Sequence, residues 1–276
     1  MGSVSLALQC GATVELDLPE PNPDRADAIF VLGVRKSGST LFNRLAIAMA
    51  KRYQVPWVDI GGGFFSRDLK ATQWVEDPAV ATLFKPGYMF GGFRTPYGHF
   101  RESAVYREGR KVLLVRDPRD ALVSQYFSTL KTHSLPKLQQ AAGGAAEQIL
   151  RQREQAQSQT VDDYVLLNAR SFRRTLESYL PLLDDPGMQV FRYEQVILNK
   201  APWIRDTLKA IGLPMHKAFV DKLLAEHDVQ PAAEDTSQFV RKVTPGDHQE
   251  KLRPATIEAL NLIFADVAKP FGYRLR

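Results

Sequence analysis

The sequence predicts an α/β fold of three layers, in which a central, mainly parallel sheet is flanked by helices in a P-loop-like arrangement. Two observations lead to this prediction. A continuous apolar run at residues 28–34 is typical of a strand buried on both faces of a parallel sheet, and a similar strand is expected at residues 111–115, Lys-Val-Leu-Leu-Val. A polar loop and then residues with helical periodicity follow each run, as in a strand–loop–helix unit.

The remaining elements follow in chain order from the same signals. We expect a single domain over residues 1–276, in which residues 1–27 form a short strand at 13–18 and a proline-rich connector. Asp117, Pro118 and Asp120 suit the N-cap, N1 and N3 positions of a helix that ends near residue 131. Further strands are expected at 55–60, 88–93 and 189–192, and further helices at 160–183, 201–211, 217–226 and 254–268.

Composition excludes several protein classes. The chain has 276 residues, of which 44% are hydrophobic, so it has enough apolar material for a large core and is not disordered. Its 36 Lys and Arg against 31 Asp and Glu favour an anionic ligand without requiring nucleic acid. The single Cys10 provides neither an internal disulfide nor a metal cluster. Without a secretory signal or a long apolar run, we expect a cytoplasmic protein with no membrane span.

The loop after the first apolar run predicts an anion site. Its residues 33–40 read Gly-x-x-x-x-Gly-Ser-Thr and lead into a helix, whose first N–H groups and dipole favour a negative ligand. A nucleotide triphosphatase would have Lys directly after the second glycine, whereas here Ser39 stands there and the lysine is Lys36. A simple turn capped by Ser39 or Thr40 is the alternative interpretation.

Residues 35–41, Arg-Lys-Ser-Gly-Ser-Thr-Leu, resemble the 5′-phosphosulfate loop of sulfotransferases that use 3′-phosphoadenosine 5′-phosphosulfate (PAPS). Arg116, at a strand end, and Ser124, eight residues later, are similar to that family's 3′-phosphate motif. Residues 190–194 and 239–248 resemble two later motifs, a strand ending in Tyr-Glu and a loop whose Arg and Lys close over the 3′-phosphate. The likeness extends over roughly residues 28–273 and is strongest on the cofactor side.

This resemblance implies in-line transfer of a sulfuryl group from PAPS to a hydroxyl of a small molecule or saccharide, with 3′-phosphoadenosine 5′-phosphate (PAP) as product. Lys36 would stabilise the charge that develops during transfer. No metal is expected, and Leu41 replaces a Trp that stacks on adenine in many cytosolic members. The cofactor residues implied are Arg35, Lys36, Ser37, Gly38, Ser39, Thr40, Arg116, Ser124, Tyr193, Arg241 and Lys242.

The general base is less clearly marked. Cytosolic members of the family have a histidine at the strand end where this chain has Arg94, and arginine does not accept a proton. His99 and His133 are the candidates that we rank equally, and Glu102 is the third. A set of aromatic residues is predicted to line the acceptor pocket, and the alternative is that they belong to the hydrophobic core. They are Phe64, Phe65, Tyr88, Phe90, Phe93, Tyr97 and Phe127.

Two other functions fit parts of the sequence. A P-loop kinase with a displaced lysine would need Mg²⁺ and a nucleoside triphosphate. A non-enzymatic protein could bind polyanions through a basic surface patch, and its binding would weaken steeply with salt. The residues proposed for that patch are Arg101, Arg107, Arg110, Lys111 and Arg119.

Overall fold

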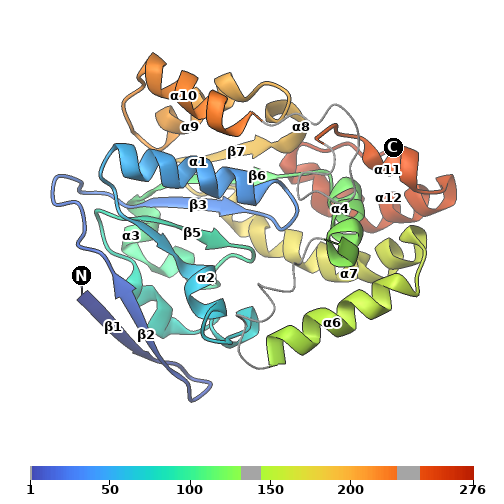
Figure 1. Ribbon diagram of the computed structural model, residues 1–276, viewed down its shortest axis with the longest axis horizontal. Coiled ribbons are helices and arrows are strands. Elements are labelled where there is room, and N and C mark those ends of the chain that lie inside the picture. The colour runs from blue at the N-terminus through green and yellow to red at the C-terminus, as the bar shows by residue number, and fades with distance from the viewer. Residues whose placement is uncertain (1, 132–143, 229–242) are drawn as a thin grey trace.

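A five-stranded sheet lies at the centre of the computed structural model, which describes residues 2–131, 144–228 and 243–276 (Figure 1). The strand order is β4-β5-β3-β6-β7, and all four neighbouring pairs are parallel. This topology confirms the predicted α/β class. The strands are β3 (Ile29–Gly33), β4 (Trp57–Asp59), β5 (Met89–Phe93), β6 (Arg110–Val115) and β7 (Met188–Arg192).

Helices cover both faces of this sheet (Figure 1). Side chains alternate along β3, so that Ile29 and Val31 join one core layer while Phe30 and Leu32 join the other. The first layer, called the α1 face, is covered by α1 (Ser39–Arg52), α9 (Lys200–Ala210) and α10 (Lys217–His227). The second, called the α7 face, is covered mainly by α3 (Ala104–Glu108), α4 (Pro118–Lys131), α7 (Val161–Tyr179) and α12 (Pro254–Ala268).

Four more helices lie in the described structure. They are α2 (Ile60–Phe65), α6 (Gly144–Gln157), α8 (Tyr193–Val196) and α11 (Asp247–Lys251). Single turns of 3₁₀ helix lie at η1 (Ala71–Gln73), η3 (Phe100–Glu102), η4 (Leu180–Leu182) and η5 (Lys269–Phe271), and a longer one lies at η2 (Pro78–Leu83).

The predicted helix boundaries agree closely with the structure where a cap residue marks them. Asp117 accepts a hydrogen bond from the Arg119 N–H at 2.9 Å, which confirms it as the N-cap of α4. Thr160 caps α7 in the same way, by accepting from the Asp163 N–H. The prediction for this helix was too long at its other end, because Pro181 stands in a 3₁₀ turn after α7 has ended at Tyr179.

The N-terminal prediction needs correction. Residues 13–18 do form a strand, β2 (Thr13–Leu18), but it pairs in an antiparallel hairpin with β1 (Gly2–Ala7), which was not predicted. This hairpin is a separate two-stranded sheet. Alternate residues of its strands, such as Leu6 and Leu16, are buried in the core of the α7 face, and that burial holds the hairpin in place.

Candidate active site

The loop between β3 and α1 has the backbone of an anion site. Lys36 and Gly38 both adopt left-handed conformations, with φ of 66° and 88°, and Gly38 is the N-cap of α1. Gly38 has no side chain to cap the helix, and the first turn of α1 contains no acidic residue. Ser37 is fully buried and donates from Oγ to the Val34 carbonyl at 2.6 Å, which fixes the turn. The first N–H groups of α1 therefore suit an anionic ligand.

Tyr193 joins this loop to the second predicted anion site. A Cβ on Gly38 would lie 3.1 Å from the Tyr193 ring, so only glycine lets the loop pack this closely. The guanidinium of Arg116, at the end of β6, lies over the same ring with its Cζ 4.3 Å from the ring centroid. Arg116 is buried, and its Nε has no hydrogen-bond partner in the structure. The structure thus brings Gly38, Arg116 and Tyr193 together, although they lie far apart in sequence.

Asp120 connects Arg116 to the C-terminal segment. One carboxylate oxygen lies 3.7 Å from Nη2 of Arg116 and accepts from the Gly246 N–H at 2.7 Å. The other accepts from the His248 N–H at 3.0 Å and lies 2.6 Å from Nδ1 of the His248 ring. Burial would raise the pKa of Asp120, but the hydrogen bond from His248 and the charge of Arg116 outweigh burial and lower it to about 2.

Glu194 ties the ends of β6 and β7 to the C-terminus. Its carboxylate accepts from the Asp117 N–H at 2.8 Å and from the Tyr273 hydroxyl at 2.8 Å. Burial raises the pKa of Glu194, while these hydrogen bonds oppose the rise. Glu194 thereby fixes the start of α8, where Tyr193 stands. Neither Glu194 nor the Asp120–His248 pair was predicted as part of the site, and the only sequence signal for Asp120 was its N3 position.

Arg35 points to a different place from the other loop residues. Its guanidinium lies over the ring of Phe172 in α7, with Cζ 5.2 Å from the ring centroid. Phe172 belongs to the core of the α7 face, whereas Leu114, which packs near Gly38, belongs to the core of the α1 face. The loop therefore has two sides, which we call the Tyr193 side and the Phe172 side.

His99 lies in the loop before η3, and both of its ring nitrogens have partners. Nδ1 is 2.9 Å from a Glu102 carboxylate oxygen and Nε2 is 3.0 Å from the Glu76 carbonyl. The hydrogen bond with Glu102, and then that with Glu76, raises the pKa of His99 above its ordinary value. Its role as base stays a prediction. His133, Arg241 and Lys242 lie outside the described residues.

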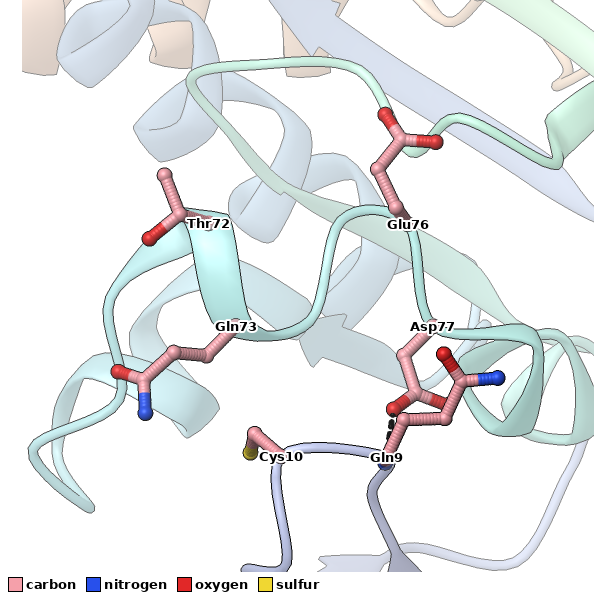
Figure 2. A pocket seen from close by; sticks show the side chains of 6 residues that line it. All are labelled: Gln9, Cys10, Thr72, Gln73, Glu76 and Asp77. Carbon is pink, nitrogen blue, oxygen red and sulfur yellow. Dashed lines mark hydrogen bonds between the residues drawn. The ribbon is translucent and has the colours of Figure 1, made fainter.

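A hollow of about 260 Å³ lies next to Glu76, between the turn of the N-terminal hairpin and η1. Figure 2 shows its lining, with the Gln9 N–H bonded to the Asp77 carboxylate. None of its lining residues belongs to the glycine loop or to the end of β6, and none is basic. Those residues are Gln9, Cys10, Thr72, Gln73, Glu76 and Asp77.

The aromatic residues predicted for an acceptor pocket are mostly core. Phe90, for example, stacks on Phe30 with ring centroids 5.3 Å apart, inside the core of the α7 face. Phe65 is exposed, and Phe127 is half-buried. The pocket prediction is therefore wrong for the buried members, because aromatic side chains on a sheet pack against one another. These members are Phe64, Tyr88, Phe90, Phe93 and Tyr97.

The basic patch suggested for polyanion binding has two buried members. Lys111 is 0% exposed and donates to the carbonyls of Arg107, Gly109 and Pro186 at 2.8–2.9 Å. Arg119 is 7% exposed and forms a bidentate ion pair with the Asp117 carboxylate. Two of the five proposed cations are thus used inside the protein, and the exposed ones are Arg101, Arg107 and Arg110, so the structure does not favour the polyanion-binding alternative.

Comparison with known proteins agrees with this geometry. Residues 26–272 match the sulfotransferase domain family. The chain belongs to the sulfotransferase family. No sequence of a curated protein matches it.

Solved structures of other sulfotransferase-like proteins share the fold. A mouse sulfotransferase complexed with PAP has 12% sequence identity and a TM-score of 0.58, over 89% of this chain and 85% of that one. Retinol dehydratase in complex with androsterone and PAP has 13% identity and a TM-score of 0.55, over 99% and 91%. Its complex with retinol and PAP has 13% identity and a TM-score of 0.57, over 99% and 92%. At such identities the comparison supports the fold of this sulfotransferase, and its site rests on its own residues.

Two further features of the described residues concern membranes and metals. None of their helices combines the length and the apolar character needed to cross a bilayer. No group of three or more His, Cys, Asp or Glu side chains among them is arranged to hold a metal ion.

Proposed function

We propose that this sulfotransferase moves a sulfuryl group from PAPS to a hydroxyl of a small molecule or saccharide. The observation that carries the proposal is the Tyr193 ring, which packs against both Gly38 and Arg116. It links two anion sites of different construction, a helix N-terminus and a buried guanidinium. PAPS has two anionic groups on one nucleoside, and PAP is the ligand bound in the related mouse structure.

Each group of residues has a separate task in this proposal. The N–H groups of residues 38–40 hold the 5′-phosphate, while Arg116, with its unpaired Nε, and Ser124 on α4 hold the 3′-phosphate. Lys36 stabilises the negative charge that grows on the phosphate oxygen as the bond from that oxygen to sulfur breaks. The acceptor oxygen forms the new bond to sulfur, and its proton passes to a base for which His99, His133 and Glu102 stay the candidates.

PAP binding tests this proposal directly. PAP at about 100 times its dissociation constant should stabilise the protein by about 2.7 kcal/mol, measured by thermal denaturation without added metal. Mg-ATP at the same concentration should give a smaller shift, because it lacks a 3′-phosphate for Arg116. Stabilisation by Mg-ATP alone would contradict the sulfotransferase assignment of the site and favour the kinase alternative.

We also propose a cytoplasmic location. Cys10 is the only cysteine of the chain, and its thiol is free and exposed. Such a thiol suits a reducing compartment, where it does not enter mixed disulfides. Fractionation of the native host, with detection of this protein beside cytoplasmic and envelope markers, tests the location.

A further inference from the structure

Arg35 stands next to Lys36 but contacts a different aromatic ring from the groups assigned to PAPS. Its guanidinium lies over the ring of Phe172, which belongs to the core of the α7 face. Tyr193 and Arg116, by contrast, contact each other, and the Tyr193 ring packs beside Gly38. A group bound by Arg35 would therefore approach the reacting centre from the Phe172 side.

The Arg35 guanidinium has no charge partner within the protein as described. Its Nε and Nη2 are buried and make no hydrogen bond, and no carboxylate of residues 2–131, 144–228 or 243–276 lies within ion-pair distance. Burial lowers the pKa of Arg35, with an opposing influence from Tyr164 and from no acidic side chain. A buried cation without a counter-charge is costly, so proteins retain one where a ligand supplies that charge.

The polar group that acts on Arg35 is the Tyr164 hydroxyl of α7, and uncharged side chains of α4 contact that hydroxyl. The Tyr164 hydroxyl accepts from Nε2 of Gln125 at 3.2 Å and lies 3.1 Å from Oγ1 of Thr129. Oε1 of Gln125 is also buried and unpartnered in the structure. These side chains suit the hydroxyl groups of a ligand, and Arg35 adds a single cation beside them.

We propose that Arg35 binds an anionic group of the sulfuryl acceptor, such as a carboxylate, sulfate or phosphate, and so selects negatively charged acceptors. This inference rests on the proposed function. Nε and Nη2 of Arg35, both without a hydrogen-bond partner, stand side by side on a planar guanidinium and suit two oxygens of such a group. Because Arg35 and Lys36 are consecutive, one acceptor would extend from the guanidinium of Arg35 to the reacting centre at Lys36.

A matched pair of hydroxyl ligands tests the proposal. Para-hydroxyphenylpropionate and para-hydroxyphenylpropionamide have nearly the same shape and differ in charge. Their dissociation constants are measured by calorimetry for the wild type, R35Q, R35K and R170Q, each with and without saturating PAP. Arg170 is exposed on the same helix as Phe172 and serves as the control position. Thermal denaturation of each variant verifies folding.

The wild type should bind the carboxylate about tenfold or more tightly than the amide, as expected for a charge-assisted hydrogen bond. R35Q should lose this preference and keep PAP affinity within about threefold, while R170Q should behave like the wild type. R35K should keep a reduced preference, because it retains the charge without the fork. If R35Q does not fold, the reduction in R35K decides the matter.

Two results would overturn the inference. Equal binding of carboxylate and amide by the wild type would exclude anion selection. A loss of PAP affinity in R35Q with an unchanged carboxylate preference would assign Arg35 to the cofactor, as its place in the sequence motif predicts. Absence of PAP binding to the wild type would count against the proposed function alone, since the carboxylate preference is also measured without PAP.

Discussion

The two arginines on either side of the glycine loop differ in how their charge is balanced. Arg116 has a carboxylate, Asp120, 3.7 Å away, and that carboxylate is itself held by Gly246 and His248. Arg35 has an aromatic ring beneath it and no carboxylate among the described residues. The Tyr193 side is therefore organised before any ligand arrives, whereas the Phe172 side depends on its ligand for a counter-charge.

Replacement of Lys36, which stands between the two sides, should have the largest effect. We expect K36A to lower kcat by about 10² to 10³, because its ammonium meets charge that develops only in the transition state. PAP affinity should change little. Steady-state kinetics and calorimetry measure the two quantities, and equal losses in both would make Lys36 a ground-state ligand.

Removal of the Asp120 charge should break the organisation of the Tyr193 side. D120N leaves Arg116 as a buried cation without its partner and should lower the free energy of unfolding by about 3 kcal/mol. D206N, at an exposed position of α9, is the control and should be neutral. Chemical denaturation measures both, and equal stabilities of the two variants would show that Asp120 does not stabilise this side.

The same carboxylate predicts a pH dependence. Because the pKa of Asp120 is lowered to about 2 from the model-peptide value of 3.8, its stabilisation is present above pH 3.8 and is lost as the pH falls toward 2. The wild type should therefore lose stability in this range, and D120N should lose less. Thermal denaturation between pH 5 and pH 2 compares the two proteins, and parallel curves would contradict the assignment.

The general base is tested by H99A and H133A together. One of them should lose about 10² or more in kcat with normal PAP affinity. If His99 is the base, kcat should rise with pH through a pKa above 6.5, because its hydrogen bond to Glu102 favours the protonated ring and only the neutral ring accepts a proton. Near-normal kcat in both variants would instead leave Glu102 as the candidate.

Arg116 should affect binding more than turnover. We expect R116A to raise the KM for PAPS by about 10 to 100-fold, as for loss of a charge-assisted hydrogen bond to phosphate. The change in kcat should be smaller. R205A, at an exposed position of α9, is the control. A fall in kcat with an unchanged KM would move Arg116 from the 3′-phosphate to the reacting centre.

The smallest effect is expected at Tyr193. Its hydroxyl donates to the Val243 carbonyl at 3.2 Å, while its ring supports Gly38 and Arg116. Y193F keeps the ring and should weaken PAP binding by less than about threefold, whereas Y193A should weaken it by about tenfold or more. Calorimetry with PAP distinguishes them, and equal losses would show that the hydroxyl matters more than the ring.

Sequence reasoning succeeded where the signal lay within one turn of the chain. The glycine loop and the Asp117 cap each need only neighbouring residues, so the pattern predicts them. The Asp120–His248 contact joins residues 128 positions apart, and neither residue indicates it alone. The direction of Arg35 was equally hidden, because it depends on where α7 packs. The lining of the acceptor site was mistaken for the same reason, since an aromatic residue looks identical in a core and in a pocket.

The buried Lys111 has a practical consequence for measuring stability. Its amine is fully enclosed and donates to three carbonyls, and burial lowers its pKa. Amine-reactive reagents will modify the many exposed lysines at once, but they will reach Lys111 only when β6 separates from its neighbours. The rate at which mass spectrometry finds this one side chain labelled therefore reports opening of the central sheet, in the intact protein and without denaturant.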